Sequence, residues 1–540
     1  MPDERLILDH VYDHEARQPG RIYLTQPLGG GQVVDYTWGQ VMDQARRMAA
    51  HLQAQGLPRG SRVAILSKNC AHFIIAELAI WMAGCTTVAI FPTERAVTVR
   101  YVLDHSEAKL LFVGKLDTWQ EQRAGVPEGL PCIALPLAPP TPYETWDAIV
   151  ARTAPLAGRP ARSADELAML LYTSGSTGQP KGVMISFGAI TRAAEGIAAD
   201  TRARIGADVD ARMLSYLPLA HSFERSWVEA QSLVDGRTQL FFAESLETFL
   251  QDLQRARPTL FISVPRLWLK FQQGVFAKMP PAKLDRLLGL PIIGRLVARK
   301  VRKGLGLDAV IQAGSGSAPL PPDLIRWYRR LGLRLFEGYG MSEDNSYSHS
   351  SNERFSEPGY VGVAMPGVQV RLSPEGEILI KSPGQFSGYF KQPELRADGM
   401  LKITGRTKEL FKTAKGKYVA PAPIENRLNA HPMVEMSMVS GVGQSAAYAM
   451  VVPAEALRPR LDDAAVRAEI EREMQALLAR VNGEVAEYEQ LQVIVVVREP
   501  WSIENGTLTP TMKIKRGPIE QAVAPRVETW YATGRRVIWA

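Results

Sequence analysis

Between residue 38 and about residue 115, amphipathic helical stretches alternate with short apolar runs. The segments are WGQVMDQARRMAAHLQAQG, RVAILS, AHFIIAELAIWMAG and TTVAIF, in that order. Strands that alternate with helices are typical of βαβ units, which build parallel sheets covered by helices on both faces. The alternation resumes with RMLSYLP at residue 212, so we expect a doubly wound α/β fold over most of the chain.

A chain of 540 residues is too long for one hydrophobic core, because single cores stop growing at roughly 250 to 300 residues. Residues 366–390 alternate apolar and polar side chains between turn glycines, which predicts a small β part after the α/β part. The end of the chain has its own helical pattern at 462–481 and its own strand pattern at 491–497. We expect an N-terminal domain at 1–405, with a β subdomain from about 357, and a C-terminal domain at 406–540.

The chain carries a formal net charge of +7 and has a pI near 9.1. Its basic residues gather in RKVRKGLG (299–306), RWYRRLGLR (326–334) and MKIKR (512–516). Such groups are either solvated helix faces or surfaces that attract polyanionic cofactors or an anionic membrane. No helix-turn-helix, zinc-finger or RNA-binding signature accompanies the charge, so we expect no nucleic-acid partner.

Three cysteines, Cys70, Cys85 and Cys132, lack the spacing of a metal or redox site, and their odd number argues against a disulfide framework. The charged start of the chain has no apolar signal core, and the longest apolar run, FIIAELAIWMAG, has only 12 residues. We therefore expect a cytoplasmic protein without a membrane span. Peripheral contact with the inner face of the membrane and a homodimeric state both stay open.

The stretch LLYTSGSTGQPKGVMIS, from Leu170 to Ser186, places glycines, hydroxyl residues and a lysine directly after an apolar run. A strand that opens into such a loop is typical of a phosphate-binding site. The standard nucleotide loop G-x-x-x-x-G-K-[ST] does not fit, because Gln179 and Pro180 separate Gly178 from Lys181. The residues alone therefore indicate either a different phosphate loop or a surface turn.

Five motifs follow one another along the chain: YTSGSTGQPKG (172–182), LPLAHSFER (217–225), EGYGMSE (337–343), GRTKELFKTAKGKYVAPAPIE (405–425) and LTPTMKIKR (508–516). Together they resemble the adenylate-forming, or AMP-binding, superfamily. LAHSFER, ISVPRLW and TPTMKIKR resemble the long-chain fatty acyl-CoA synthetases within it. The resemblance implies a doubly wound N-terminal domain with a small β-barrel-like part, a small mobile α+β C-terminal domain, and a fatty acid ligase that uses ATP, Mg²⁺ and coenzyme A.

The resemblance also implies a nucleotide site in the N-terminal domain. Backbone N–H groups of the glycine-rich loop and the charge of Lys181 would hold the β and γ phosphates of ATP. Thr173 and Glu343 match the family's magnesium positions and offer the hard oxygen ligands that this ion needs, and Glu343 is also expected to serve catalysis. Tyr339 would stack on adenine and Glu337 would face its exocyclic amine. The other expected nucleotide contacts are Ser174, Gly175, Ser176, Thr177, Gly178, Gly316, Ser317, Gly338, Gly340, Met341, Ser342 and Arg406, the last on the ribose.

The remaining expected roles concern the acid and the thioester. Lys513 aligns with the lysine that bridges the attacking carboxylate and the α-phosphate, Lys412 with a lysine of the thioester-forming conformation, and Lys408 with the hinge of the C-terminal domain. Solvated surface lysine is the alternative for each. His221 and Phe223 resemble the wall of the carboxylate pocket, and Trp268 resembles the gate of an acyl tunnel. A lone tryptophan is also a common core residue.

One departure from the family bears on activity. The family's T-G-D segment, whose aspartate binds both ribose hydroxyls, is missing, because GYFKQPELRADGMLKITGR runs directly from Leu395 to Asp398. Asp398 resembles a turn residue better than a ribose ligand. Two alternatives stay open beside a fatty acid:CoA ligase. One is a ligase that loads a carrier protein. The other is a catalytically impaired homologue that binds acyl chains or nucleotide, and the missing segment is the evidence for it.

Inserting a family-like T-G-D loop after Leu395 should lower the KM for ATP at least about tenfold, because the two lost hydrogen bonds are charge-assisted and act on ground state and transition state alike. Steady-state kinetics with varied ATP measure this. The same insertion with alanine in place of the aspartate is the control. An unchanged KM would mean that another residue already holds the ribose.

Overall fold

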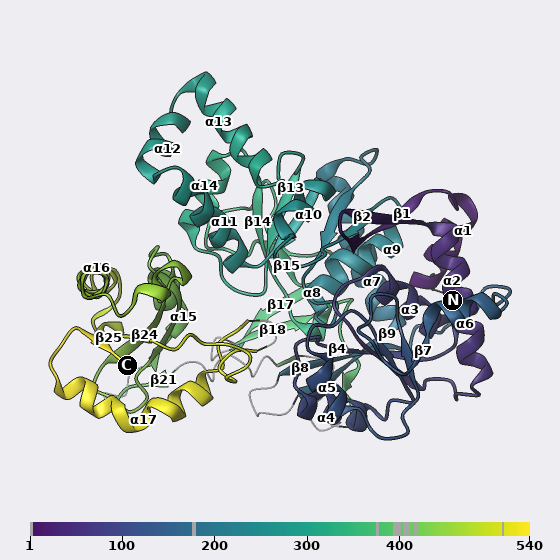
Figure 1. The fold of residues 1–540 in the computed structure, drawn as a ribbon. Helices are drawn as coiled ribbons and strands as arrows, with labels where there is room; N and C mark the ends of the chain where they lie inside the picture. Colours follow the sequence, from purple (N-terminus) through teal and green to yellow (C-terminus); the bar gives the residue numbers. More distant parts are fainter. Residues whose placement is uncertain are drawn as a thin grey trace. The chain divides into compact units, whose positions relative to one another are not determined.

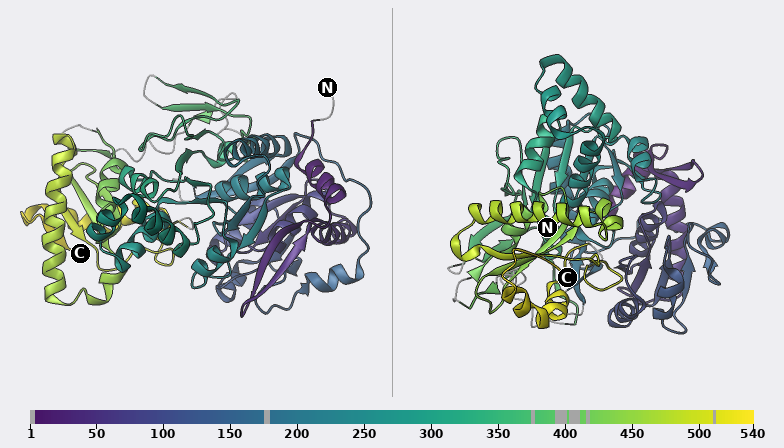
Figure 2. Two further views of the ribbon diagram at one scale, coloured as in Figure 1. Left: turned by 90° about the horizontal axis from the view of Figure 1, so that it is seen from above. Right: turned by 60° about the vertical axis from the view of Figure 1, so that its left-hand side comes forward.

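The computed structural model of the protein describes residues 4–174, 180–373, 377–391, 401–402, 411–414, 418–509 and 512–540 (Figures 1 and 2). The chain forms two compact units, Met1–Lys402 and Ile403–Ala540. The division after Lys402 lies close to the boundary expected after residue 405. Among the described residues, no helix is both long and apolar enough to cross a bilayer.

An eight-stranded sheet carries the predicted phosphate loop. Its strands, in spatial order, are β19 (Gly388–Tyr389), β9 (Pro180–Ser186), β8 (Leu167–Ser174), β4 (Thr86–Ile90), β3 (Arg62–Leu66), β5 (Leu110–Val113), β6 (Cys132–Ala134) and β7 (Glu144–Thr145). The strands from β8 to β7 are parallel, whereas β9 and β19 run antiparallel to their neighbours. The βαβ alternation predicted from the sequence is thus confirmed for this sheet.

Helices cover both faces of this sheet, as a doubly wound fold requires. Along β3, Val63 and Ile65 belong to the core that contains α3 (Ala71–Met82), while Ala64 and Leu66 face a second core that contains α4 (Ala96–Ser106). The alternation follows from the two-residue repeat of a strand. Every residue of α3 is buried, so its almost wholly apolar sequence matches a helix with no solvent face. The other helices around this sheet are α1 (Ile7–Arg17), α2 (Trp38–Ala54), α5 (Trp119–Gln122), α6 (Trp146–Arg152) and α7 (Phe187–Ile205).

A four-stranded sheet lies against the same core. Its strands, in order, are β10 (Arg212–Ser215), β11 (Gln239–Phe242), β1 (Ile22–Gly29) and β2 (Gln32–Thr37). The chain between β10 and β11 holds α8 (Ser222–Glu224), a π-helical turn at Arg225–Ala230 and α9 (Gln231–Asp235), and α10 (Phe249–Ala256) follows β11. π-helical turns are rare and often mark functional sites.

A five-stranded sheet positions two further motifs. Its order is β12 (Leu260–Ser263), β13 (Gln312–Ser315), β14 (Leu335–Tyr339), β15 (His349–Ser350) and β16 (Val363–Ala364), and the first three strands are parallel. The loops after these three strands therefore meet at one edge, where α/β sheets bind ligands. Around the sheet lie α11 (Pro265–Lys278), α12 (Pro281–Leu288), α13 (Pro291–Gly304) and α14 (Pro322–Arg330), over an aromatic and aliphatic core of their own.

The predicted small β part is an antiparallel sheet of the order β17 (Gln369–Leu372), β18 (Ile378–Lys381) and β20 (Leu401–Lys402). The last segment expected in this sheet, residues 388–389, is not part of it. Strand β19 leaves the small sheet and pairs with β9, with Tyr389 opposite Val183. This pairing brings residues 388–389 to the β8–β9 hairpin, which carries the predicted phosphate loop, an arrangement that local sequence alternation does not reveal.

The second unit is a layered α+β fold. Its sheet has the order β23 (Val434–Ser440), β24 (Ala447–Pro453), β25 (Leu491–Val496) and β26 (Val537–Trp539), and a short hairpin joins β21 (Phe411–Lys412) to β22 (Tyr418–Val419). Helices α15 (Pro421–Asn429) and α16 (Ala464–Glu484) pack on one face of the sheet and α17 (Arg516–Ala532) on the other (Figure 1). The predicted helix and strand of this region are confirmed.

Candidate functional site

The predicted phosphate loop connects two antiparallel strands. In the β8–β9 ladder Thr173 lies opposite Lys181, and Ser174 lies opposite Pro180. The structure thus places Thr173 and Lys181 side by side at the base of the loop. The side chain of Ser174 and the loop residues Gly175, Ser176, Thr177 and Gly178 lie outside the described part of the chain.

Tyr389 connects this hairpin to the EGYGMSE motif. The Lys181 Nζ lies 5.4 Å from the centroid of the Tyr389 ring, within the range of a cation–π contact. The Tyr389 hydroxyl donates to the Glu343 Oε1 at 2.7 Å. Burial is the main cause that raises the Tyr389 pKa above its usual value, and the nearby Glu343 charge adds to it, so the hydroxyl keeps its proton to donate. Tyr389 was not among the residues predicted from the sequence.

The turn that carries Glu343 is tightly constrained. A side chain at Gly340 would place its Cβ 2.6 Å from the backbone of Ser346, so this position requires glycine. The Asp344 carboxylate accepts a hydrogen bond from the Met341 backbone N–H at 2.8 Å. Burial, reinforced by the charge of Glu343, raises the Asp344 pKa to about 7. Close packing and a buried cap therefore set the direction in which Glu343 points.

Residues 337–339 lie at the end of β14. Tyr339 and Gly338 pair with His349 and Ser350, and the Tyr339 and His349 rings are 6.1 Å apart. Glu337 is buried, and its two carboxylate oxygens accept backbone hydrogen bonds from Leu320 at 3.1 Å and Gly359 at 3.4 Å. The carboxylate thus holds two loops together. Its expected contact with adenine stays a prediction.

The LPLAHSFER motif meets the loop after β13. The Phe223 ring lies so close to Gly316 that a Cβ there would be 3.2 Å from it, and Ser317 has a left-handed backbone with φ of 68°. The His221 Nδ1 accepts from the Phe223 N–H at 3.1 Å, which fixes the imidazole at the start of α8. Two predicted residues from distant parts of the chain, Gly316 and Phe223, are thus brought together.

Ser222, which the sequence did not single out, connects LPLAHSFER to EGYGMSE. Its Oγ accepts from the Ser346 Oγ at 2.9 Å and lies 3.3 Å from the Ser342 Oγ. Trp227 adds a hydrogen bond from its Nε1 to the Ser346 carbonyl at 2.9 Å. The predicted carboxylate wall and the predicted nucleotide turn therefore share one hydrogen-bonded boundary.

A largely buried hydrogen-bond network holds the chain that leads to His221 and Phe223. The Glu224 Oε1 accepts from the Ser215 hydroxyl at 2.7 Å, the Tyr216 N–H at 3.1 Å and the Asn69 Nδ2 at 3.2 Å. Asn69 also donates to the Leu217 carbonyl and accepts from the Leu219 N–H. Desolvation raises the Glu224 pKa to about 8. The network thus holds the turn between β10 and His221 through backbone groups.

A buried ionic cluster follows directly in the chain. The guanidinium of Arg225 contacts Glu77 of α3 and Glu229, the latter at 2.8 Å, and all three side chains are almost completely buried. Desolvation raises the pKa of Glu229 well above its ordinary value. Removing one partner of a buried pair typically costs about 3 to 5 kcal/mol, so the cluster anchors the π-helical turn to α3.

Trp268 is completely buried at the start of α11. Its ring packs edge-on against Phe261 at 5.3 Å and Tyr328 at 4.9 Å, and its backbone carbonyl accepts from the Tyr328 hydroxyl at 2.6 Å. This environment is that of a core residue. Its role as the gate of an acyl tunnel stays a prediction.

The second unit holds the remaining predicted residues. Lys513 is exposed, and its backbone forms two hydrogen bonds with Thr509, at 2.8 and 3.0 Å. Lys412 lies in β21, but its side chain is not described, and Arg406 and Lys408 lie outside the described residues.

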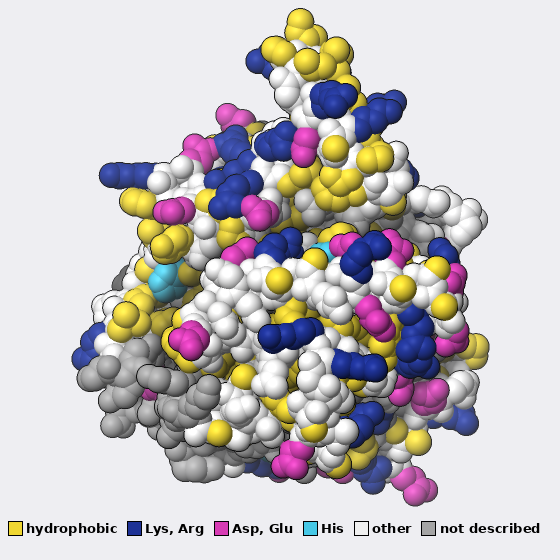
Figure 3. Space-filling model, turned by 90° about the vertical axis from the view of Figure 1, so that its left-hand side faces the viewer, with side chains coloured by type: hydrophobic (Ala, Val, Ile, Leu, Met, Phe, Trp, Pro, Cys, Tyr) yellow, Lys and Arg dark blue, Asp and Glu magenta, His cyan; other side chains and the backbone are white. Residues whose placement is uncertain are grey.

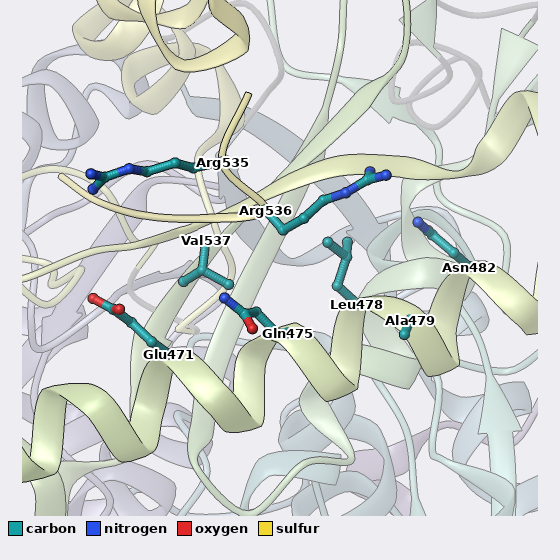
Figure 4. A pocket seen from close by; sticks show the side chains of 8 residues that line it. All are labelled: Glu471, Gln475, Leu478, Ala479, Asn482, Arg535, Arg536 and Val537. Atoms are coloured by element: carbon teal, nitrogen blue, oxygen red, sulfur yellow. The ribbon is translucent and has the colours of Figure 1, made fainter. Parts of the chain in front are cut away.

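A groove of about 640 Å³ in the second unit lies between α16 and residues 535–537 (Figure 4). None of its lining residues is a predicted site residue: Glu471, Gln475, Leu478, Ala479, Asn482, Arg535, Arg536 and Val537.

Comparison with known proteins places these motifs in a family. Residues 11–390 match the family described as AMP-binding enzyme, and residues 409–535 match the AMP-binding enzyme C-terminal domain. A long-chain-fatty-acid–CoA ligase of Mycobacterium bovis is 30% identical over 96% of this chain and 96% of its own length. A fatty acyl-CoA synthetase of Dictyostelium discoideum is 28% identical over 94% of this chain and 88% of its own length.

Solved structures show the same fold. The adenylation domain of a carboxylate reductase from Mycobacterium chelonae superposes with a TM-score of 0.78 at 22% identity, over 98% of this chain and 92% of that chain. Residues 391–408, where the ribose-binding segment was expected, fall between the two family matches.

Replacing Glu224 with glutamine should make the pH dependence of stability less steep. The native carboxyl group keeps its proton up to a pKa of about 8, whereas the unfolded group ionises near 4.5, so unfolding becomes easier as pH rises between these values. Glu224 should contribute a slope of about 1.4 kcal/mol per pH unit, and the raised pKa values of Glu229 and Asp344 add slopes of the same sign. Urea unfolding from about pH 5 to 8 measures the total. Glu224→Gln should lower the slope by the share of Glu224, while Glu224→Ala should lower it equally and reduce stability at every pH. An unchanged slope in Glu224→Gln would mean that other groups account for all of it.

If Trp268 gates an acyl tunnel, Trp268→Ala should alter the preference for acyl chain length while leaving the affinity for ATP unchanged, because a gate would touch only the acyl chain. The deletion should also lower stability by about 3 to 5 kcal/mol, as for other buried aromatic side chains. Trp327→Ala in the same core is the matched control. Equal losses for every acid in both variants would make Trp268 a core residue only.

Proposed function

Because this chain belongs to the AMP-binding enzyme family and its near full-length relatives are acid–thiol ligases, we propose that it is an ATP-dependent fatty acid:CoA ligase. The acid attacks the α-phosphate to give acyl-AMP and pyrophosphate, and the CoA thiolate then displaces AMP. The observation that carries the proposal is the chain of contacts from Lys181 through Tyr389 to Glu343 at the base of the phosphate loop. A long-chain acid is the substrate class that the relatives' names suggest.

The residues at the base of the loop fit the phosphates and Mg²⁺. Lys181 offers a positive charge, and Thr173 and Glu343 offer the oxygen ligands that Mg²⁺ prefers. The hydrogen bond from Tyr389 orients the Glu343 carboxylate before the ion binds. Bound Mg²⁺ would neutralise negative charge on the phosphates, which favours attack at the α-phosphate. Positioning and charge stabilisation are the main catalytic devices in phosphate chemistry.

The EGYGMSE motif would bind the nucleotide, and the neighbouring LPLAHSFER motif would bind the acid. Tyr339 would stack on adenine, with Gly316 and Ser317 on the other side of the ring. His221 and Phe223 would line the carboxylate end of the acid, and the Ser222 bridge would hold that wall at a constant distance from the nucleotide turn. In this arrangement the carboxylate of the acid and the α-phosphate of ATP would meet where the LPLAHSFER and EGYGMSE motifs contact each other.

The C-terminal unit would complete each half-reaction in turn. Lys513 would enter the site for adenylation, and rotation about Lys408 would replace it with Lys412 for thioester formation. Arg406 would hold the ribose. Two rival functions remain: a ligase that transfers the acyl group to a carrier protein in place of CoA, and a catalytically impaired homologue, which the missing T-G-D segment favours.

ATP-dependent release of AMP with a panel of fatty acids, with and without CoA, tests the proposal. CoA-dependent turnover supports the ligase. Adenylation that stalls at acyl-AMP in the presence of CoA would favour a carrier-protein acceptor. A folded protein that forms no acyl-AMP would favour the impaired homologue.

Lys513→Ala should nearly abolish acyl-AMP formation, by about 10² to 10³ in rate, because it removes a cation aimed at developing negative charge. Acid-dependent exchange of labelled pyrophosphate into ATP measures this step. Given synthetic acyl-AMP and CoA, the same variant should form thioester at close to the unmutated rate. Lys515→Ala, two residues away, is the matched control. Parallel loss of both half-reactions in a folded variant would make Lys513 a structural residue.

A further inference from the structure

The helical hairpin α12–α13 ends in an unusually apolar surface. Leu290, Ile292, Ile293 and Leu296 are exposed by 42%, 76%, 47% and 62%. We call these four residues the apolar tip. They lie in the connection between the two helices and in the first turns of α13. Figure 3 shows hydrophobic side chains gathered at the end of this hairpin, at the top of the view, with Lys and Arg side chains beside and below them.

The inner side of the hairpin packs against the core of the five-stranded sheet. Leu284 and Ala298 are buried in the core of the five-stranded sheet, and Val297, Val301 and Leu305 pack partly against it. The apolar tip is on the opposite side of α13 and is not needed to complete that core. Contiguous exposed apolar surface on a folded protein commonly marks a site that binds a membrane or another molecule.

Basic residues flank the apolar tip without acidic neighbours in the sequence. Arg295, Arg299, Lys300 and Lys303 are exposed on α13, and we call them the basic collar. Residues 286–307 contain six Lys and Arg residues and no Asp or Glu. With a rise of about 1.5 Å per residue, Lys300 lies only about 10 Å along the helix from Ile293. An anionic surface at the level of the tip would therefore be within about one Debye length of most of the collar.

We propose that the α12–α13 hairpin docks the protein on an anionic lipid bilayer. The apolar tip would enter the boundary between headgroups and acyl chains, and the basic collar would lie among the anionic headgroups, as in other interfacial amphipathic helices. A second copy of the chain fits less well, because joining two tips would bring two basic collars together. The proposal is independent of the reaction and of the acid that is activated.

Vesicle co-sedimentation tests the surface. The full chain should bind phosphatidylcholine vesicles in which about a third of the lipid is phosphatidylserine, should bind pure phosphatidylcholine far more weakly, and should be released by high salt. Arg299→Gln/Lys300→Gln/Lys303→Gln should weaken binding about a hundredfold, since each basic residue contributes roughly fivefold. Ile292→Ser/Ile293→Ser should weaken binding to both kinds of vesicle.

Two matched variants separate this surface from general effects. Val97→Ser/Leu372→Ser removes exposed apolar residues elsewhere, and Arg17→Gln/Arg100→Gln/Arg472→Gln removes the same charge elsewhere; both should bind anionic vesicles like the unmutated protein. Circular dichroism checks that each variant is folded. The proposal is overturned if the tip and collar variants bind normally or if the matched variants lose binding equally. It is also overturned if light scattering shows a dimer that only the tip variants dissociate and the protein binds no vesicles.

Discussion

The hydrogen bond from Tyr389 to Glu343 determines how the parts of the candidate site are placed. Tyr389 belongs to β19, which pairs with β9 of the hairpin that carries the predicted phosphate loop. Glu343 belongs to the turn after β14 of another sheet. Two further bonds strengthen this connection: the Phe386 N–H donates to the Glu343 carbonyl, and Asn345 donates to the Gly384 carbonyl at 2.8 Å. A carboxylate and a lysine that are 162 positions apart in the chain (343 − 181) thereby share one aromatic neighbour.

A buried ionic cluster also fixes part of the candidate site. Helix α3 is apolar except for His72 and Glu77, and Arg225 reaches Glu77 from the π-helical turn to compensate its buried charge. A buried ion pair contributes little net stability over an apolar substitute, but losing one partner is costly. The cluster therefore specifies where the π-helical turn sits. His221 and Phe223 lie just before that turn, so the orientation of these two side chains depends on the cluster and on Glu224.

Local sequence predicted the elements of the fold and several of the site's neighbours. The helix at Trp38–Ala54 begins with a capping box formed by Thr37 and Gln40. The short, continuously apolar runs form the buried parallel strands β3 and β4. The motifs also identified Thr173, Lys181, Gly316 and Phe223, which the structure brings together in pairs. Tyr389, Ser222 and Asn69 were missed, because their partners lie tens to hundreds of positions away and no local pattern marks them.

The sequence by itself determined the βαβ alternation, the two-part organisation, and where the charged and glycine-rich segments lie, because these depend on local periodicity and side-chain chemistry. Only the tertiary structure decided that Glu337 holds the loops at Leu320 and Gly359, that β19 joins the large sheet, and that Trp268 packs within an aromatic core. The physical reason is distance. A hydrogen bond requires its donor and acceptor to approach within about 3 Å, and only the folded chain selects which groups meet.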